Sequence, residues 1–179
     1  IDQIAGEGAN ISALAQAGLL NFGFVDQYAF GGLNVSGVAQ LGALNGARIA
    51  QNALGGMNVS GVAQAGVLNG AWIAQDAVLG GVNASGVAQL GALNGAWIDQ
   101  TAGLLGVNVN AVAQAGMLNG AWIAQDAWRP GSLNVNALAQ MGLGNVGLVN
   151  QTAIGGINNS AHVQDGYGNL YMASQTAIY

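Results

Sequence analysis

One repeated pattern constrains this chain more than any other feature. Residues 34–51 read NVSGVAQLGALNGARIAQ, in which two units of the form Asn-x5-Gln are joined by a short link that contains glycine. The pattern recurs seven times at intervals of 24 to 26 residues and covers almost the whole chain. A repeat of this period predicts an array of stacked structural units. The copies begin at Asn10, Asn34, Asn58, Asn83, Asn108, Asn134 and Asn158.

The repeat also predicts the domain organisation. Gln3 precedes Asn10 by seven residues, as Gln51 precedes Asn58, so residues 1–9 resemble the end of an incomplete copy. We expect a partial repeat over 1–9 and one seven-repeat domain over 10–179. Ile1 opens directly into repeat-like sequence without a visible signal peptide, which predicts a processed or trimmed chain.

The charge composition excludes several classes of partner. The 179 residues include seven acids and only two cations, both arginine, for a net charge of −5. So few cations cannot neutralise a phosphate backbone, and nucleic-acid binding is not expected. The shortage of cations also argues against docking to anionic lipid. The absence of cysteine rules out a disulfide framework and a thiolate metal site.

A transmembrane interpretation fails on the spacing of the amide side chains. Residues 49–75 carry no charge and are numerous enough to span a bilayer. A spanning helix, however, needs about 20 predominantly apolar residues. Asn and Gln interrupt this segment every few positions, as they do along the entire chain. We therefore expect no membrane insertion.

The choice between helix and strand rests on periodicity. The alanine-rich copies could be drawn as amphipathic helices, but each contains several interior glycines, which cost a helix about 1 kcal/mol apiece. Within each half of a copy the nearly invariant positions alternate with variable ones. Arg48, for example, is replaced by Trp or Leu in later copies, whereas its neighbour Ile49 hardly changes. A constant face and a variable face at period two predict β-strands.

The sequence therefore predicts an all-β fold, a parallel β-solenoid with two strands per turn and about seven rungs that could stack further into cross-β fibrils. Equivalent amides would lie above one another, each donating to one neighbour and accepting from the other. A column satisfies amides that would each cost about 1–3 kcal/mol if buried alone. The four predicted ladders are Asn10, Asn34, Asn58, Asn83, Asn108, Asn134 and Asn158; Gln16, Gln40, Gln64, Gln89, Gln114, Gln140 and Gln164; Asn21, Asn45, Asn69, Asn94, Asn119, Asn145 and Asn169; and Gln27, Gln51, Gln75, Gln100, Gln125, Gln151 and Gln175.

Two further columns support the same stacking. Val38 and Ile49 and their counterparts are predicted to fill the interior between the amides. A glycine two residues after the first Gln of each copy is predicted to form a tight turn. These turn glycines are Gly18, Gly42, Gly66, Gly91, Gly116, Gly142 and Gly166. None of the nine charged residues falls on a predicted inward position, as expected from the cost of burying an unpaired charge.

The predicted outer surface is unusually apolar. Valines line one sheet at positions equivalent to Val35, and Trp72, Trp97 and Trp122 would form a column on the other. Three tryptophans in vertical register predict a contiguous apolar stripe, and such stripes usually mark an interface. We expect these residues to form a lateral interface. The ends of the solenoid are also expected to leave strand edges that can pair with another copy.

Catalytic and metal-binding chemistry finds no support in the sequence. His162 is the only histidine and occupies a position that is valine in earlier copies, so we interpret it as a variation at the end of the array. The inward serines lack a histidine or acid to activate them. The outward acids form interrupted columns and are interpreted as solubilising charges. We expect no enzyme activity, no cofactor and no metal.

The frame Ser/Asn-x5-Gln-x-Gly-x2-Asn-x-Ala/Gly-x3-Gln resembles the repeat of curlins, the subunits of curli fibres. NVSGVAQLGALNGARIAQ and NVSGVAQAGVLNGAWIAQ match it, and the resemblance covers all seven copies. The first position here is Asn where curlins usually have Ser, and the outward residues are more apolar. The resemblance implies an extracellular bacterial functional amyloid, secreted unfolded through a pore, started by a nucleator subunit and assembled into cell-surface fibres of the biofilm matrix.

Two functions of different classes follow. The first is a structural subunit that polymerises with itself by end-to-end stacking of rungs, for biofilm matrix and adhesion. The alternative is a secreted β-solenoid adhesin or binding module that does not polymerise and uses its exposed Trp/Val stripe. Filaments with a spacing near 4.8 Å along their axis would favour the first, and a monomer that persists at high concentration would favour the second.

Overall fold

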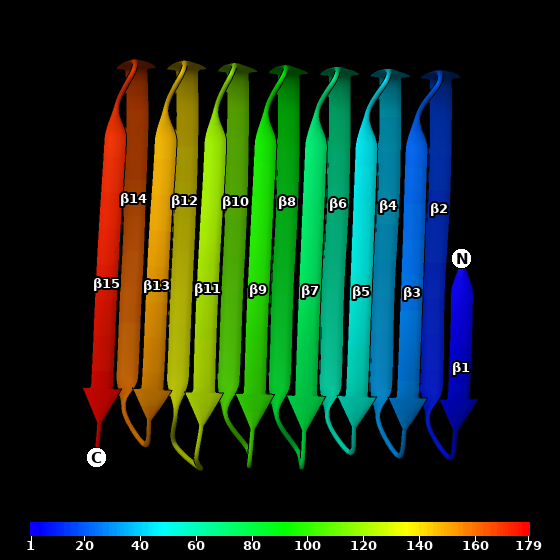
Figure 1. The fold of residues 1–179 in the computed structure, drawn as a ribbon, viewed down its shortest axis with the longest axis vertical. Coiled ribbons are helices and arrows are strands. Elements are labelled where there is room, and N and C mark those ends of the chain that lie inside the picture. Colours follow the sequence, from blue (N-terminus) through cyan, green and yellow to red (C-terminus); the bar gives the residue numbers. More distant parts are fainter.

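The computed structural model describes residues 1–179 as two parallel β-sheets stacked face to face, with no helix (Figure 1). This confirms the predicted β-solenoid of about seven turns, because each copy contributes one strand to each sheet. The seven-stranded sheet contains β2 (Ala9–Leu19), β4 (Leu33–Ala43), β6 (Met57–Val67), β8 (Val82–Ala92), β10 (Val107–Met117), β12 (Leu133–Leu143) and β14 (Ile157–Tyr167). The eight-stranded sheet contains β1 (Asp2–Gly6), β3 (Phe22–Phe30), β5 (Gly46–Leu54), β7 (Gly70–Val78), β9 (Gly95–Gly103), β11 (Gly120–Trp128), β13 (Val146–Ile154) and β15 (Leu170–Ile178).

The register of the strands places like residues above like residues. Asn34 pairs with Asn58 in the seven-stranded sheet, and Gln51 pairs with Gln75 in the eight-stranded sheet. The connection from the long strand to the short one is always two residues, whereas the connection back has two to four. The differences in copy length are therefore absorbed outside the sheets, after the second Gln of each copy.

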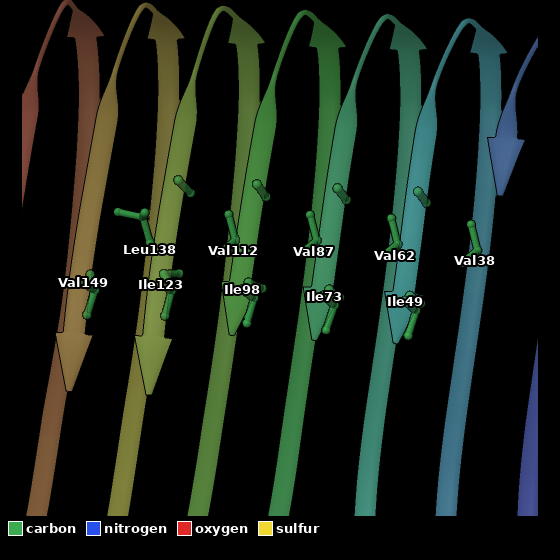
Figure 2. Close-up of a cluster of buried hydrophobic side chains, with 14 of the residues drawn as sticks. Val38, Ile49, Val62, Ile73, Val87, Ile98, Val112, Ile123, Leu138 and Val149 are labelled. Atoms are coloured by element: carbon green, nitrogen blue, oxygen red, sulfur yellow. The ribbon is translucent and has the colours of Figure 1, made fainter. Parts of the chain in front are cut away.

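The core is a narrow layer between the two sheets (Figure 2). Val38 and its counterparts on one sheet face Ile49 and its counterparts on the other, and Ile49 is fully buried. Volume is compensated within a copy. In the sixth copy Leu138 replaces valine, and the facing alanine becomes Gly147, where a Cβ would lie 2.4 Å from Leu138 Cδ2. The packing thus tolerates a larger side chain only because its partner is removed.

The glycines predicted to form the first turn have a different role. Gly42 is the penultimate residue of β4 and has a φ of 118°. The chain reverses two residues later, at Leu44 and Asn45, and Leu44 itself has a φ of 58°. A Cβ on Gly42 would lie 2.0 Å from the carbonyl oxygen of Gly66 in the next copy. Glycine is therefore required both by the local backbone and by the close approach of the stacked rungs.

The two ends of the solenoid differ. At the N-terminal end β1 pairs with β3 and places Gln3 beside Gln27. The five residues of β1 cover only part of the nine-residue strand position. At the C-terminal end both β14 and β15 are complete. The fold contains no helix with the length and apolar character needed to cross a bilayer.

Candidate functional site

All four predicted amide columns are continuous hydrogen-bonded ladders. In the Gln40 column, Gln40 Nε2 donates to Gln64 Oε1 at 2.7 Å, and Gln64 donates likewise to Gln89. In the Asn34 column, Asn58 Nδ2 donates to Asn34 Oδ1 at 3.0 Å. The middle members are buried, with the Gln100 side chain at 0% exposure. The structure thus brings together every residue that the sequence assigned to the ladders.

The ladders have a direction that the sequence did not reveal. Each asparagine donates to the preceding copy, as Asn45 does to Asn21. Each glutamine donates to the following copy, as Gln51 does to Gln75 at 2.8 Å. The two asparagine ladders therefore run opposite to the two glutamine ladders, and the polarity holds throughout the solenoid. Consequently the two ends expose complementary sets of donors and acceptors.

The ladders also bind the backbone at the turns. Asn45 Nδ2 donates to the carbonyl oxygen of Gly66 in the next copy at 3.0 Å, and the backbone N–H of Asn69 donates to Asn45 Oδ1 at 3.1 Å. Gln40 Nε2 donates across to the carbonyl oxygen of Phe22 in the other sheet at 3.0 Å. The amides therefore fix the turn, the rung spacing and the pairing of the two sheets together. Replacing one would affect all three.

A serine column reinforces the ladders in the first half of the molecule. Gln51 Nε2 donates to Ser60 Oγ at 3.0 Å, and the serines of three other copies accept the same contact. In copies five and six asparagine replaces serine. Asn136 Nδ2 donates to Asn110 Oδ1 at 2.8 Å, but Asn110 Nδ2 and Asn136 Oδ1 are buried without a partner. Two orphaned groups make this the least satisfied part of the interior.

The last copy closes the core with different side chains. His162 lies at the valine position and Tyr171 at the alanine position, and their rings stack with centroids 3.6 Å apart. Tyr171 OH and Ser160 Oγ lie 3.1 Å apart within hydrogen-bond distance. The stacked rings explain why the only histidine departs from the repeat, and they give it a packing role.

The tryptophan column lies on the outer face of the eight-stranded sheet. Trp72, Trp97 and Trp122 stack with nearly parallel rings, at centroid distances of 4.6 and 5.2 Å. The guanidinium of Arg48 lies over the Trp72 ring at 4.5 Å from its centroid and reaches toward Phe24 on the other side. The ring faces are therefore used within the column, and mainly ring edges remain for a partner.

Acidic residues lie beside this column. Burial raises the pKa of Asp99, and the nearby charges of Asp126 and Asp76 raise that pKa further. Burial also raises the pKa of Asp126, although a hydrogen bond with Thr101 acts in the opposite direction. No three His, Asp or Glu side chains are grouped so as to hold a metal ion.

The outer face of the seven-stranded sheet is the feature that the sequence analysis missed. From β2 to β12, every residue at an outward position is Ala, Gly, Val, Leu, Ile or Met. Only the valines of this face were predicted to form part of an apolar surface. The remaining members were readable from the alternation, since they are the residues between the predicted inward positions.

Comparison with known proteins identified no relative: no family model, no curated protein and no solved structure matches the chain. The geometry of the ladders, the ends and the outer faces is therefore the basis for a functional assignment.

Proposed function

We propose that this chain is the structural subunit of an extracellular, curli-like amyloid fibre that grows by end-to-end stacking of its rungs and serves biofilm matrix and adhesion. The observation that carries the proposal is the constant direction of the four amide ladders. Because each ladder runs in one direction, one of its ends has an amide N–H donor without a side-chain acceptor, and its other end has an amide oxygen without a donor. The two ends of neighbouring subunits could therefore bond to each other. By the resemblance to curlins, a nucleator and a secretion pore would be its partners.

The two ends would fit in the register of the interior. On the C-terminal end, Asn158 Oδ1 accepts no side-chain bond, and Gln164 Nε2 donates only to backbone carbonyls. On the N-terminal end, Asn10 Nδ2 donates only to backbone carbonyls and Gln16 Oε1 is without a donor. If β14 pairs with β2 of the next subunit in the fibre, Asn158 would lie beside Asn10 of that subunit, and Gln164 would lie beside its Gln16. Each donor would then meet an acceptor, as between any two rungs.

The interior would also match across the junction. Tyr171 of the seventh copy lies beside Gly147 of the sixth copy. In the stacked arrangement the residue on its other side would be Gly23 of the next copy, so the largest core side chain would lie between two glycines. Seven rungs at about 4.8 Å would give each subunit roughly 34 Å of fibre length.

Stacking in both sheets requires β1 to move. The eight-stranded sheet has one more strand than the seven-stranded sheet, and β1 is the additional one. If β14 pairs with β2 of the next subunit, β15 must pair with β3 of that subunit, in the place that its own β1 holds in the single chain. Four of the five residues of β1 are exposed, so its displacement loses little burial. Complete pairing along β15 would replace it with a longer strand.

The substitution Gly166→Ala tests the proposal. In the single chain a Cβ on Gly166 would have no neighbour nearer than 3.8 Å, whereas the equivalent Cβ on Gly142 would lie 2.1 Å from the Gly166 carbonyl oxygen. In the fibre, Gly166 would meet Gly18 of the next subunit in the same way. We expect the variant to keep its circular-dichroism spectrum but to fail to elongate fibres.

Gly168→Ala is the matched control. Gly168 also has a positive φ, of 63°, in the last copy, but a Cβ there would meet nothing within 4 Å. This control carries backbone strain without the clash and should polymerise normally. Elongation of Gly166→Ala at the rate of the unsubstituted chain would contradict stacking in this register. A persistent monomer at high concentration would instead favour the adhesin alternative.

A further inference from the structure

The two outer faces differ sharply in charge. Six of the nine charged residues lie on the eight-stranded sheet, namely Asp2, Asp26, Arg48, Asp76, Asp99 and Asp126. Glu7 and Arg129 lie in connections, and only Asp165, in the last long strand, belongs to the seven-stranded sheet. The six strands from β2 to β12 therefore present an outer face without a charged or polar side chain. We call it the aliphatic face.

The aliphatic face is too large to be an ordinary exposed patch. Six strands about 4.8 Å apart, each eleven residues long at about 3.3 Å per residue, cover on the order of 1,000 Å². Monomeric proteins rarely expose contiguous apolar patches of more than a few hundred Å². A stable interface buries about 800 Å² on each partner. The face by itself is therefore large enough for one such contact.

The face has relief that runs across the rungs. A shallow groove of about 940 Å³ follows the Gly37 and Ala39 columns along all seven strands, and every member of the two columns except Val163 is glycine or alanine. The Val35 column forms a ridge on one side, and its members Val59 and Val109 are exposed by 37% and 38%. On the other side lies the Leu41 column, in which alanine alternates with leucine or methionine from one strand to the next. The ridge and the groove repeat at the same interval, one strand spacing, because both belong to the same sheet.

We propose that the aliphatic face is covered by the aliphatic face of a second copy, with the two seven-stranded sheets packed against each other. A two-fold axis along the Gly37 column would place the valine ridge of each copy in the Ala39 column of the other. At the axis glycine would then face glycine in the second, third and fourth copies, and alanine would face alanine in the others, so the sheets could approach closely. Such a self-complementary contact is isologous and closes on itself. The aliphatic face from β2 to β12 brings no charge into this contact, and the one charge of the sheet, Asp165, lies beyond it in β14.

Other occupants fit this face less well. The tryptophan column of another copy could enter the groove, but Arg48 and Asp99 would accompany it into an apolar contact. A lipid surface would match the apolar character of the face, but it has no regular relief that would be complementary to the ridge and the groove. The proposed pairing depends on the face alone, so it can be tested separately from end-to-end growth.

The test uses two glycines of the fourth copy on opposite faces. Gly86 lies at the centre of the aliphatic face and Gly95 on the eight-stranded sheet, and a Cβ on either would meet nothing within 4 Å. Neither has a positive φ. Both Gly86→Glu and Gly95→Glu should therefore fold alike. Only Gly86→Glu would set two carboxylates against each other across the proposed axis.

The measurement is the mass per length of fibres by scanning transmission electron microscopy. We expect two chains of 17.7 kDa per subunit repeat, a twofold fall to one chain in Gly86→Glu, and no change in Gly95→Glu. One chain per repeat in the unsubstituted protein would overturn the pairing. So would a twofold fall in Gly95→Glu or Trp97→Ser while Gly86→Glu remains paired.

If no fibres form, the proposed function fails but the pairing remains testable by analytical ultracentrifugation. A dimer of the soluble chain that Gly86→Glu converts to monomer would support it, and a monomer throughout would overturn it. A monomer that binds uncharged phosphatidylcholine vesicles, with binding lost only in Gly86→Glu, would overturn it in favour of a lipid surface.

Discussion

The fourth and seventh copies contain nearly the same frame residues, yet their burial differs. In the fourth copy Val87, Ile98 and Gln100 are all at most 3% exposed. In the seventh copy β15 has no buried residue, although Gln175 occupies the same place as Gln100. The difference arises because the fourth copy has a neighbour on each side and the seventh has only one. A rung is thus stabilised largely by its neighbours, and one substitution should have different effects in the two places.

The largest difference in stability between the two copies is expected when alanine replaces the penultimate glycine of the long strand. In Gly91→Ala the Cβ would lie 1.9 Å from the Gly116 carbonyl oxygen, at a φ of 122°. Both strands are paired on either side, so the clash cannot relax easily. We expect Gly91→Ala to lower the free energy of unfolding by more than about 3 kcal/mol. Gly166→Ala carries only backbone strain and should cost about 1–2 kcal/mol. Urea denaturation of the unassembled chains measures both, and equal losses would refute the role of the neighbour.

Removing one amide should have the next largest effect. Gln89→Leu deprives the Gln114 side chain of its donor and the Gln64 side chain of its acceptor. Leaving a buried polar group unsatisfied costs about 1–3 kcal/mol, so we expect a loss of about 2–4 kcal/mol. Gln164→Leu, at the end of the ladder, affects only one other ladder residue, because it removes the acceptor of the Gln140 side chain.

The end variant should therefore lose about half as much stability as the middle one while still disturbing end-to-end assembly. Thermal unfolding followed by circular dichroism would compare the two, with Ala88→Ser as an outward control in the same strand. If Gln89→Leu were as stable as the control, the ladder would contribute little to the fold.

Much of this contrast could be predicted from the sequence, because it follows from repetition. The period-two alternation around Ile49 predicts strands, and the recurrence of Asn34 and Gln40 predicts ladders. The donor direction could not be predicted, since an amide column satisfies its members equally well with either orientation. The position of the first turn was also missed. Leu44 adopts a left-handed backbone that normally indicates glycine, whereas Gly42 serves a contact between copies.

The acids beside the tryptophan column provide a smaller and pH-dependent contrast. The folded-state pKa of Asp99 is raised, first by burial and then by Asp126 and Asp76. Folding therefore favours its protonated form, and stability should rise as the pH falls through the folded pKa, with the gain complete below the ordinary value of 3.8.

Asp99→Asn should increase stability at neutral pH and reduce the gain on acidification. Urea midpoints at several pH values between 7 and about 3 would measure this. Asp26→Asn, in the equivalent position near the N-terminal end, controls for the loss of one charge. An unchanged pH profile in Asp99→Asn would show that this carboxyl does not oppose folding.

The smallest effect is expected at the turn itself. Leu93 has a φ of 58° in the fourth copy, and the equivalent residue in the seventh copy is Gly168. Leu93→Gly relieves a left-handed conformation that costs about 1–2 kcal/mol. It also loses apolar contact and gives the unfolded chain more freedom, a cost of about 0.4–1 kcal/mol for glycine against alanine. These terms nearly cancel, so we expect the free energy of unfolding to change by no more than about 1 kcal/mol.

The reverse change, Gly168→Leu, should be equally mild, since leucine already occupies this turn in five copies. A large loss in Leu93→Gly would mean that the leucine column stabilises the turn through side-chain contact, which would make the middle turns differ from the last turn in energy as well as in residue type.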